Sequence, residues 1–348
     1  MSGAVSESLA IIVLLAVAAV SLGAWPAAAA EPSAPASAPA AAGRAASPAK
    51  DTGSDLADQQ QYAIPTHLDR IGRIIAPVMI NGRGPFRFML DTGATRTVLA
   101  ESALAKLDRV EDPDGRVPIS GIAGSELAPT VHVDSLEIGD LHFHDLDLPV
   151  LSGPVLYGID GILGMDGFDG MKVSADFEKD RVTVSRSTAQ PPGGLYPIIQ
   201  VEFVSYRLLM INAHVGRVPV KAVIDTGGTR TIGNPALLAA LIKGRQDSVA
   251  FKTDVVDATQ MWKQGMMGEV PGVQLGNATI SNLDVTFGDF QIFKTWGLEG
   301  EPALLIGMDV LGTLQNLTID YRRKEVVLQA PWMMRAPTEQ HWHSLTYW

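Results

Sequence analysis

The amino-acid sequence predicts an all-β protein built from two homologous lobes. Three observations predict this fold class: one unit of sequence occurs twice, short runs of Val, Ile, Leu and Phe alternate with turn residues in both halves, and the 348 residues include 34 glycines and 22 prolines. Short apolar runs separated by Gly, Pro, Asp and Asn are typical of strands joined by turns. The length fits two lobes of moderate size that follow an N-terminal segment.

The repeated unit decides the architecture. It runs from Gly82 to Gly93 and occurs again, at constant spacing, from Gly216 to Gly227, and each copy ends in Asp-Thr-Gly after an apolar run. Thr-Arg-Thr follows both copies, and an Ala- and Leu-rich stretch then predicts a helix, over Ala100–Leu107 in the first half. One unit used twice predicts two lobes of similar structure.

A second pair of matching segments closes each half. Ile159–Asp166 and Ala303–Asp309 each contain two apolar residues followed by Gly-Met-Asp, and each precedes a final strand region that carries a charged turn. The lobe boundary is expected at residues 187–197, because the run Pro-Pro-Gly-Gly in that stretch cannot continue a strand. We therefore expect an N-terminal lobe at 63–186, a C-terminal lobe at 198–330 and a tail at 331–348.

The N-terminal segment predicts export. Leu9–Trp25 is an almost unbroken apolar run, and four alanines at 27–30 offer the small residues at which signal peptides are cleaved. No Lys or Arg precedes Arg44, which leaves an uncleaved membrane anchor as the alternative. Residues 1–30 are expected to be a signal peptide or anchor and residues 31–62 a disordered Ala-, Pro- and Ser-rich tether. The expected location is periplasmic or secreted, with possible anchoring to the membrane.

Composition excludes several functions. The formal net charge of −11 disfavours nucleic acid as a partner, since binding to the phosphate backbone needs clustered Lys and Arg. The chain has no cysteine, so it has no disulfide, no Cys-ligated zinc and no thiolate nucleophile. It also has no Gly-x-Ser-x-Gly elbow and no Walker pattern, which leaves serine hydrolase and nucleotide-binding functions with little support.

Asp91 and Asp225, one from each Asp-Thr-Gly, are the candidate catalytic residues. Two adjacent carboxyl groups can hydrolyse a peptide bond without a metal or a covalent nucleophile. Crowding raises the pKa of one member strongly, so the pair holds one proton, and one carboxyl acts as base towards water while the other acts as acid.

The neighbouring residues suit this chemistry. Thr92 and Thr226 are placed to hydrogen-bond across the lobe interface, and Gly93 and Gly227 permit the backbone turn that presents each carboxylate. We therefore expect these four residues to support the active site.

With both Asp-Thr-Gly loops and the Gly triplets Ile162–Gly164 and Leu305–Gly307, the chain resembles the pepsin and retropepsin superfamily of aspartic peptidases. It is most similar to the bacterial retropepsin-like group in which both lobes are fused, over roughly residues 63–329. The resemblance implies a pepsin/retropepsin-like (acid protease) fold, with two β-barrel-like lobes and the active-site cleft between them. It implies an aspartic endopeptidase that holds an extended polypeptide and needs no cofactor. Because both halves lie in one chain, a monomer suffices for catalysis.

The resemblance also implies flaps, which are hairpins that cover the substrate. The candidate in the first lobe is Val117–Pro129, and the second candidate, Thr253–Gly268, contains Trp262 and several methionines. Pepsin-like enzymes usually carry a flap tyrosine and none occurs between Val110 and Leu151, so a pepsin-like orientation of the substrate does not follow. The tip of the first flap is expected at four residues: Gly121, Ile122, Ala123 and Gly124.

Two other groups of residues could have a functional role or could simply lie at the surface. His142, His144, Asp145 and Asp147 suggest a metal site, but we expect a solvated strand face with all except Asp145 on one side and no convergence, and hence no metal. The arginines of the two Thr-Arg-Thr segments could neutralise charge near the carboxyl pair, face solvent or bridge the lobes.

Two alternatives to a general endopeptidase remain open at this point. A catalytically weak peptide-binding or scaffold protein could keep the fold and grip extended chains by strand addition. A self-processing enzyme could cleave its own tether. The intact pair of aspartates favours an enzyme over the binding protein.

Overall fold

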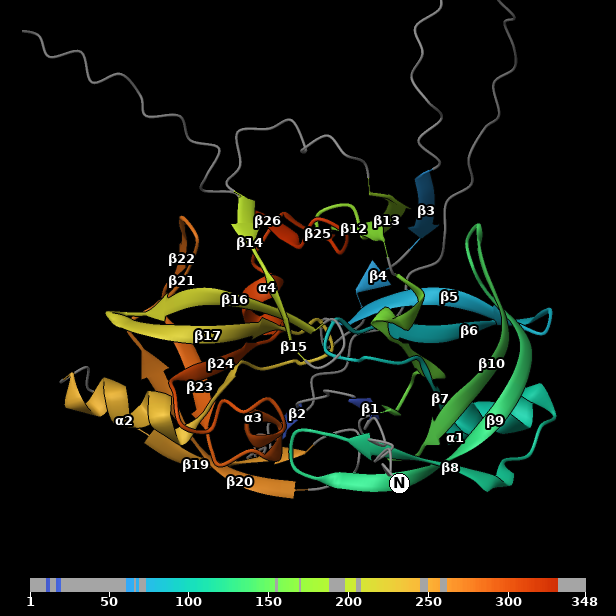
Figure 1. The fold of residues 1–348 in the computed structure, drawn as a ribbon, viewed down its shortest axis with the longest axis horizontal. Coiled ribbons are helices and arrows are strands. Elements are labelled where there is room, and N and C mark those ends of the chain that lie inside the picture. The colour runs from blue at the N-terminus through green and yellow to red at the C-terminus, as the bar shows by residue number, and fades with distance from the viewer. Residues whose placement is uncertain are drawn as a thin grey trace, which may run out of the picture.

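The computed structural model describes residues 11–12, 17–19, 61–65, 67–68, 73–153, 156–168, 170–187, 198–204, 208–244, 250–256 and 262–330. These residues form three β-sheets and four short α-helices, arranged as two lobes side by side (Figure 1). The predicted all-β, bilobal fold is confirmed.

Nine strands form the sheet of the first lobe, in the order β1-β8-β9-β10-β7-β11-β6-β5-β4. Their bounds are β1 (Ile11–Ile12), β4 (His67–Leu68), β5 (Ile74–Ile80), β6 (Arg83–Leu90), β7 (Val98–Ala100), β8 (Asp112–Ser120), β9 (Ser125–Ile138), β10 (Leu141–Leu151) and β11 (Gly161–Leu163). Helix α1 (Glu101–Leu107) follows β7, where the sequence predicts a helix. Asn81 and Gly82 join β5 to β6 with φ of 50° and 68°, the left-handed geometry of a tight hairpin turn.

The sheet of the second lobe repeats the central topology of the first. Its order is β2-β19-β20-β23-β18-β24-β17-β16-β21-β22, with β15 paired to β16. The parallel and antiparallel pairings within β23-β18-β24-β17 match those within β10-β7-β11-β6. The bounds are β2 (Val17–Ala19), β15 (Glu202–Val204), β16 (Leu208–Val215), β17 (Val218–Ile224), β18 (Ile232–Gly233), β19 (Ala250–Val256), β20 (Trp262–Val270), β21 (Val273–Leu275), β22 (Ala278–Ile280), β23 (Leu283–Phe287) and β24 (Ala303–Ile306).

Three helices accompany the second sheet: α2 (Pro235–Lys243), α3 (Gln291–Thr295) and α4 (Met308–Leu311). Asn234 caps the start of helix α2, and its side-chain oxygen accepts the amide of Leu237 at 2.9 Å, with Pro235 in the first turn. An Asn cap followed by Pro is a strong start signal, because the side chain satisfies an orphan amide and Pro has none to satisfy.

The third sheet joins the lobes. Its order is β14-β26-β25-β12-β13-β3, with bounds β3 (Gln61–Pro65), β12 (Met171–Asp176), β13 (Arg181–Arg186), β14 (Ile198–Gln200), β25 (Asn316–Asp320) and β26 (Glu325–Gln329). The final strand region of each half is therefore a hairpin, and the two hairpins pair through β12 and β25, with Val173 opposite Ile319. The hydroxyl oxygens of Ser174 and Thr318 lie 2.8 Å apart across this seam. One hydrophobic cluster runs through both lobes and this sheet.

Several predicted segments lie almost wholly outside the described residues. They are the signal peptide or anchor at 1–30, the tether at 31–62, the interlobe linker at 187–197 and the tail at 331–348. In the described part of the chain, no helix has the length and apolar character needed to cross a membrane.

Candidate active site

Asp91 and Asp225 occupy equivalent positions at the ends of β6 and β17. The amide of Asp91 donates to the carbonyl of Leu163 at 3.1 Å, and the amide of Asp225 donates to the carbonyl of Ile306 at 3.0 Å. Neither aspartate exposes any of its surface. The apolar strand ends and the Gly triplets thus carry both carboxyl groups into a dry centre.

Thr92 and Thr226 cross-link the two loops. The hydroxyl of Thr92 donates to the carbonyl of Ile224 at 3.0 Å, and the hydroxyl of Thr226 donates to the carbonyl of Leu90 at 2.9 Å. Each hydroxyl also accepts the amide of the other threonine at 3.0 Å. The structure therefore places both residues where the sequence predicts cross-lobe hydrogen bonds.

Backbone amides hold the inner oxygen of each carboxylate. Gly93 donates to Oδ1 of Asp91 at 2.7 Å, and Gly227 donates to Oδ1 of Asp225 at 2.9 Å. Gly228 adds a second bond to the same oxygen of Asp225 at 3.1 Å. A Cβ added at Gly227 would overlap the carboxyl group of Asp91, so the carboxyl of the first lobe lies directly against the loop of the second.

Burial and mutual proximity make this pair easy to protonate. Burial, followed by the charge of Asp225, raises the pKa of Asp91 well above its ordinary value. Burial also raises the pKa of Asp225, to about 7. The outer oxygens, Oδ2 of both residues, have no hydrogen-bond partner in the described part of the protein. Two buried carboxylates at close range repel each other, so the doubly charged state has a high free energy. The pair therefore retains a proton up to near-neutral pH.

The Gly triplets pass directly beneath the catalytic loops. A Cβ at Gly164 would collide with the main-chain carbon and oxygen of Arg96, and one at Gly307 would lie 2.7 Å from the same atoms of Arg230. The residue after the first triplet also bonds to the catalytic loop of its lobe: the amide of Met165 donates to the carbonyl of Ala94 at 2.9 Å. Only glycine fits where two backbones approach this closely.

A pair of Thr–Asp contacts supports the loops and was not predicted from the sequence. The Thr97 hydroxyl donates to Oδ1 of Asp166 at 2.9 Å and accepts the amide of Gly164 at 3.2 Å. In the second lobe, the Thr231 hydroxyl donates to Oδ1 of Asp309 at 2.7 Å. The matching Thr-Arg-Thr and Gly-Met-Asp segments were the available signal, but sequence does not show that their side chains bond to each other.

Both flap candidates are hairpins. The first is β8–β9, with a tip at residues 121–124 in which the amide of Gly121 donates to the carbonyl of Gly124 at 2.8 Å. The second is β19–β20, at the place expected for Thr253–Gly268. The side chain of Trp262 lies outside the described residues.

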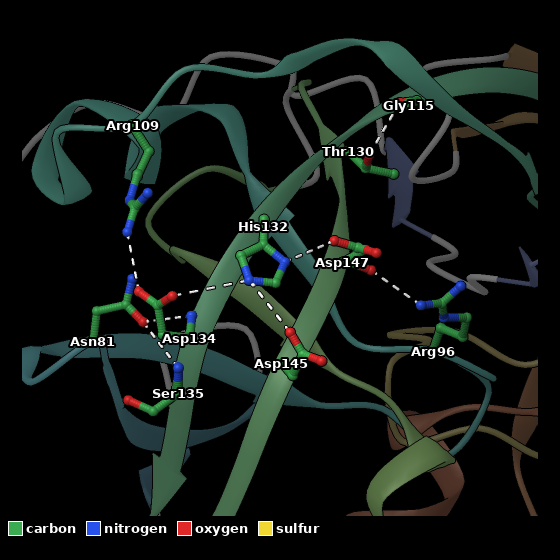
Figure 2. A network of polar contacts seen from close by, with 10 residues as sticks. All are labelled: Asn81, Arg96, Arg109, Gly115, Thr130, His132, Asp134, Ser135, Asp145 and Asp147. Atoms are coloured by element: carbon green, nitrogen blue, oxygen red, sulfur yellow. Dashed lines mark hydrogen bonds and ion pairs between the residues drawn. The ribbon is translucent and has the colours of Figure 1, made fainter.

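The candidate metal ligands on β10 do not converge as a metal site. Asp145 and Asp147 both face His132 of β9, whose Nδ1 lies 3.0 Å from Oδ1 of Asp147 and whose Nε2 lies 3.5 Å from Oδ1 of Asp145 (Figure 2). The hydrogen bond to Asp147 and the neighbouring carboxylate charges raise the pKa of His132. Within the described residues, no group of His, Asp and Glu side chains is arranged to hold a metal.

The expected division of the faces of β10 is wrong. Asp147 lies on the side of Asp145, whereas Nδ1 of His142 lies 3.9 Å from Oε1 of Glu137. Strand alternation places residues an odd number of positions apart on opposite faces, so His142 and Asp147 cannot share one.

The arginines do not contact the carboxyl pair in the described structure. Arg96 instead donates from Nη2 to the carbonyl of Asp147 at 3.0 Å (Figure 2). Arg230 lies close enough to Asp309 for its charge to lower the pKa of that residue, although burial raises this pKa overall. Arg96 thus bonds to β10, and the charge of Arg230 acts on Asp309 of α4.

A comparison with protein families agrees with this geometry. A family model described as aspartyl protease matches residues 76–166 and 211–310. These two regions together cover more than half of the chain, and each contains one Asp-Thr-Gly loop and one Gly triplet. No curated protein sequence matches the chain.

Proposed function

This chain belongs to the aspartyl protease family, and on that basis we propose that it is an aspartic endopeptidase whose water nucleophile is activated by Asp91 and Asp225. The observation that carries the proposal is the pair of adjacent, fully buried carboxyl groups with raised pKa values and unpartnered Oδ2 atoms. Groups of this kind are suited to proton transfer near neutral pH.

In the proposed mechanism the pair takes one proton from water and gives one proton to the substrate. The ionised carboxylate takes a proton from water as the water oxygen attacks the carbonyl carbon, and the protonated carboxyl gives its proton to the carbonyl oxygen. When the C–N bond breaks, the carboxyl that gained the proton from water passes it to the leaving nitrogen, and the other carboxylate takes a proton from one hydroxyl of the tetrahedral intermediate, which restores the starting pair. We expect the pair to share one proton in the resting enzyme, because burial raises the pKa of both aspartates.

Two structural features support this assignment. The amides of Gly93, Gly227 and Gly228 stabilise the charged form of each Oδ1, which leaves Oδ2 as the reactive oxygen. The threonine cross-links fix the separation of the two loops, and such preorganisation lowers the barrier because no reorganisation is needed during reaction.

We propose an extended polypeptide as the substrate, held between the β8–β9 and β19–β20 hairpins. The edges of both hairpins accept extended backbone, since β1 pairs with β8 and β2 pairs with β19, and a substrate would bind by the same kind of backbone hydrogen bonds in their place. The apolar segment Leu9–Trp25 supports action outside the cytoplasm, in a secreted, periplasmic or anchored form.

The test is cleavage of a mixed peptide library by the full-length chain and by its Asp91→Asn and Asp225→Asn variants, from acid to neutral pH. Both variants are expected to lose cleavage, whereas Asp140→Asn, at an exposed aspartate outside the site, is expected to retain it. Lack of cleavage by correctly folded wild-type protein would instead favour the peptide-binding alternative.

A further inference from the structure

A cavity lies in the first lobe, next to the segment that follows the Asp91 loop. Its volume is about 290 Å³, roughly twice that of an apolar cavity that holds one benzene molecule. Its wall includes Arg96, Thr97 and Asp166. Four apolar side chains from β9, β10 and β11 also line it: Leu136, Phe143, Leu146 and Leu163. The cavity is therefore large enough for a small ligand with an apolar body.

The cavity is separate from the side of the lobe that faces the β8–β9 hairpin. Consecutive residues of a strand point to opposite faces of the sheet, and β11 follows this rule. Ile162 packs in the hydrophobic cluster that contains Ile119 of the hairpin. Leu163 lines the cavity and belongs to the cluster of Leu136 on the other face. A ligand in the cavity would therefore not occupy the place proposed for the polypeptide.

The internal repeat shows how the two lobes differ at this cavity. Gly167 follows Gly-Met-Asp in the first half, and Val310 stands at the matching position in the second. Val310 is fully buried in the hydrophobic core, whereas Gly167 lines the cavity. A Cβ added at Gly167 would lie 2.8 Å from two ring atoms of Phe143, so the ring packs against the bare main chain. The first lobe thus lacks the side chain that fills the equivalent position of the second.

Arg96 brings a positive charge to the wall of the cavity. Its Nη2 donates to the carbonyl of Asp147 at 3.0 Å, which holds the guanidinium beside Leu146, the preceding residue (Figure 2). The side chain of Arg96 is half-buried, so water screens its charge only in part. A ligand in the cavity would therefore meet the guanidinium at one end and apolar side chains along its length.

The neighbouring carboxylates already have other partners. Oδ1 of Asp147 lies 3.0 Å from Nδ1 of His132, and Oδ1 of Asp166 accepts the amide and the hydroxyl of Thr97 at 3.1 Å and 2.9 Å. Among the described residues, no carboxylate forms an ion pair with Arg96. The guanidinium therefore keeps N–H donors and a charge that can bind an anionic group.

We propose that this cavity binds a medium-chain carboxylic acid, with its carboxylate on Arg96 and its hydrocarbon chain among the four apolar side chains. A guanidinium forms charge-assisted hydrogen bonds with a carboxylate, and partial burial strengthens them. The hydrocarbon chain is stabilised in proportion to the apolar area that leaves water. This site goes beyond the proposed function, because it lies outside the place of the polypeptide and does not require cleavage.

The test is isothermal titration calorimetry of the full-length chain with octanoate. Arg96→Gln removes the charge and is expected to weaken binding at least about tenfold, because hydrogen bonds between charged groups are lost. The control is Arg230→Gln, at the matching arginine of the second lobe, which is expected to bind octanoate as tightly as wild type. Leu146→Trp places a larger side chain in the cavity and is expected to abolish binding. Thermal unfolding of each variant without ligand checks that it is folded.

Two further ligands separate the effect of the charge from that of the chain. Butanoate is expected to bind much more weakly than octanoate, because each CH₂ that the cavity buries tightens binding roughly fourfold. The uncharged 1-octanol is expected to bind equally to wild type and to Arg96→Gln. Absence of octanoate binding by the wild-type protein would overturn the proposal. Undiminished octanoate binding in Arg96→Gln and Leu146→Trp would also overturn it, since the acid would then bind elsewhere. Neither result bears on the proposed function, because peptide cleavage is measured without octanoate.

Discussion

Thr92 and Thr226 each donate a hydroxyl to a carbonyl of the opposite lobe and accept the other's amide. All four bonds are buried, and each hydroxyl uses its donor and one acceptor position. The two residues therefore connect the lobes at the base of the candidate active site.

Thr226→Val removes the hydroxyl with little change in shape. It leaves the carbonyl of Leu90 and the amide of Thr92 without these partners, so we expect the free energy of unfolding to fall by about 2 kcal/mol or more. Denaturant unfolding measures the loss, and Thr226→Ser, which keeps the hydroxyl, is expected to regain most of it. Equal losses in both variants would show that the methyl group matters rather than the bonds.

Asp225→Asn is expected to change how stability depends on pH. Because the folded state raises the pKa of Asp225 from 3.8 to about 7, its protonated form favours folding below pH 4, and this contribution disappears as the pH rises to about 7. The asparagine variant should therefore lose less stability than wild type between pH 4 and 7. Urea unfolding at both pH values provides the comparison, and a parallel loss in the two proteins would contradict the raised pKa.

Activity is expected to persist at neutral pH. The raised pKa values of both aspartates mean that the pair still holds a proton near pH 7, whereas ordinary carboxyls would have lost it. The profile of kcat/KM from pH 3 to 9 should be bell-shaped, with its acid limb set by the first ionisation of the pair. A profile that has fallen to zero by pH 6 would refute this expectation.

Gly164→Ala is expected to be severely destabilising. The new Cβ would strike the main chain of Arg96, which cannot move aside without shifting the loop that carries Asp91. We expect a loss of at least about 3 kcal/mol and loss of cleavage. Gly300→Ala is the control, since a Cβ there meets no atom within 4 Å, and thermal unfolding should separate the two variants clearly.

Thr231→Val tests the support beneath the second loop. The change leaves the partly buried carboxyl of Asp309 without a hydroxyl donor and the amide of Gly307 without an acceptor. We expect a stability loss of about 2 kcal/mol and a lower kcat with little change in KM. Thr231→Ser should restore both values, and a variant with normal kcat would show that the contact does not position the loop.

The sequence predicts those parts of the site that the repeat encodes. Two copies of Asp-Thr-Gly after apolar strands indicate that Asp91 and Asp225 occupy matching positions, and the structure places them together. The first flap that the resemblance implies, with its tip at residues 121–124, is a hairpin in the structure. The catalytic role of the pair stays a prediction.

Contacts between distant side chains could not be predicted in the same way. The bond between Thr97 and Asp166, and the burial of Ile122 in the other lobe, depend on packing that no local pattern records. The expected faces of β10 were wrong for a simpler reason: Asp147 lies an odd number of positions from His142, so strand alternation puts it on the side of Asp145. The pairing of β12 with β25 depends on how the lobes meet.

The sheet that the lobes share determines whether the two halves stay associated after the chain is cut. The β12–β25 ladder, the Ser174–Thr318 contact and the cross-lobe threonines tie the halves together without help from the connecting peptide. A proteolytic nick between residues 188 and 197 would therefore yield two fragments that stay associated, since separation would uncover two unpaired strand edges. Noncovalent contacts alone are therefore enough to hold the two lobes together.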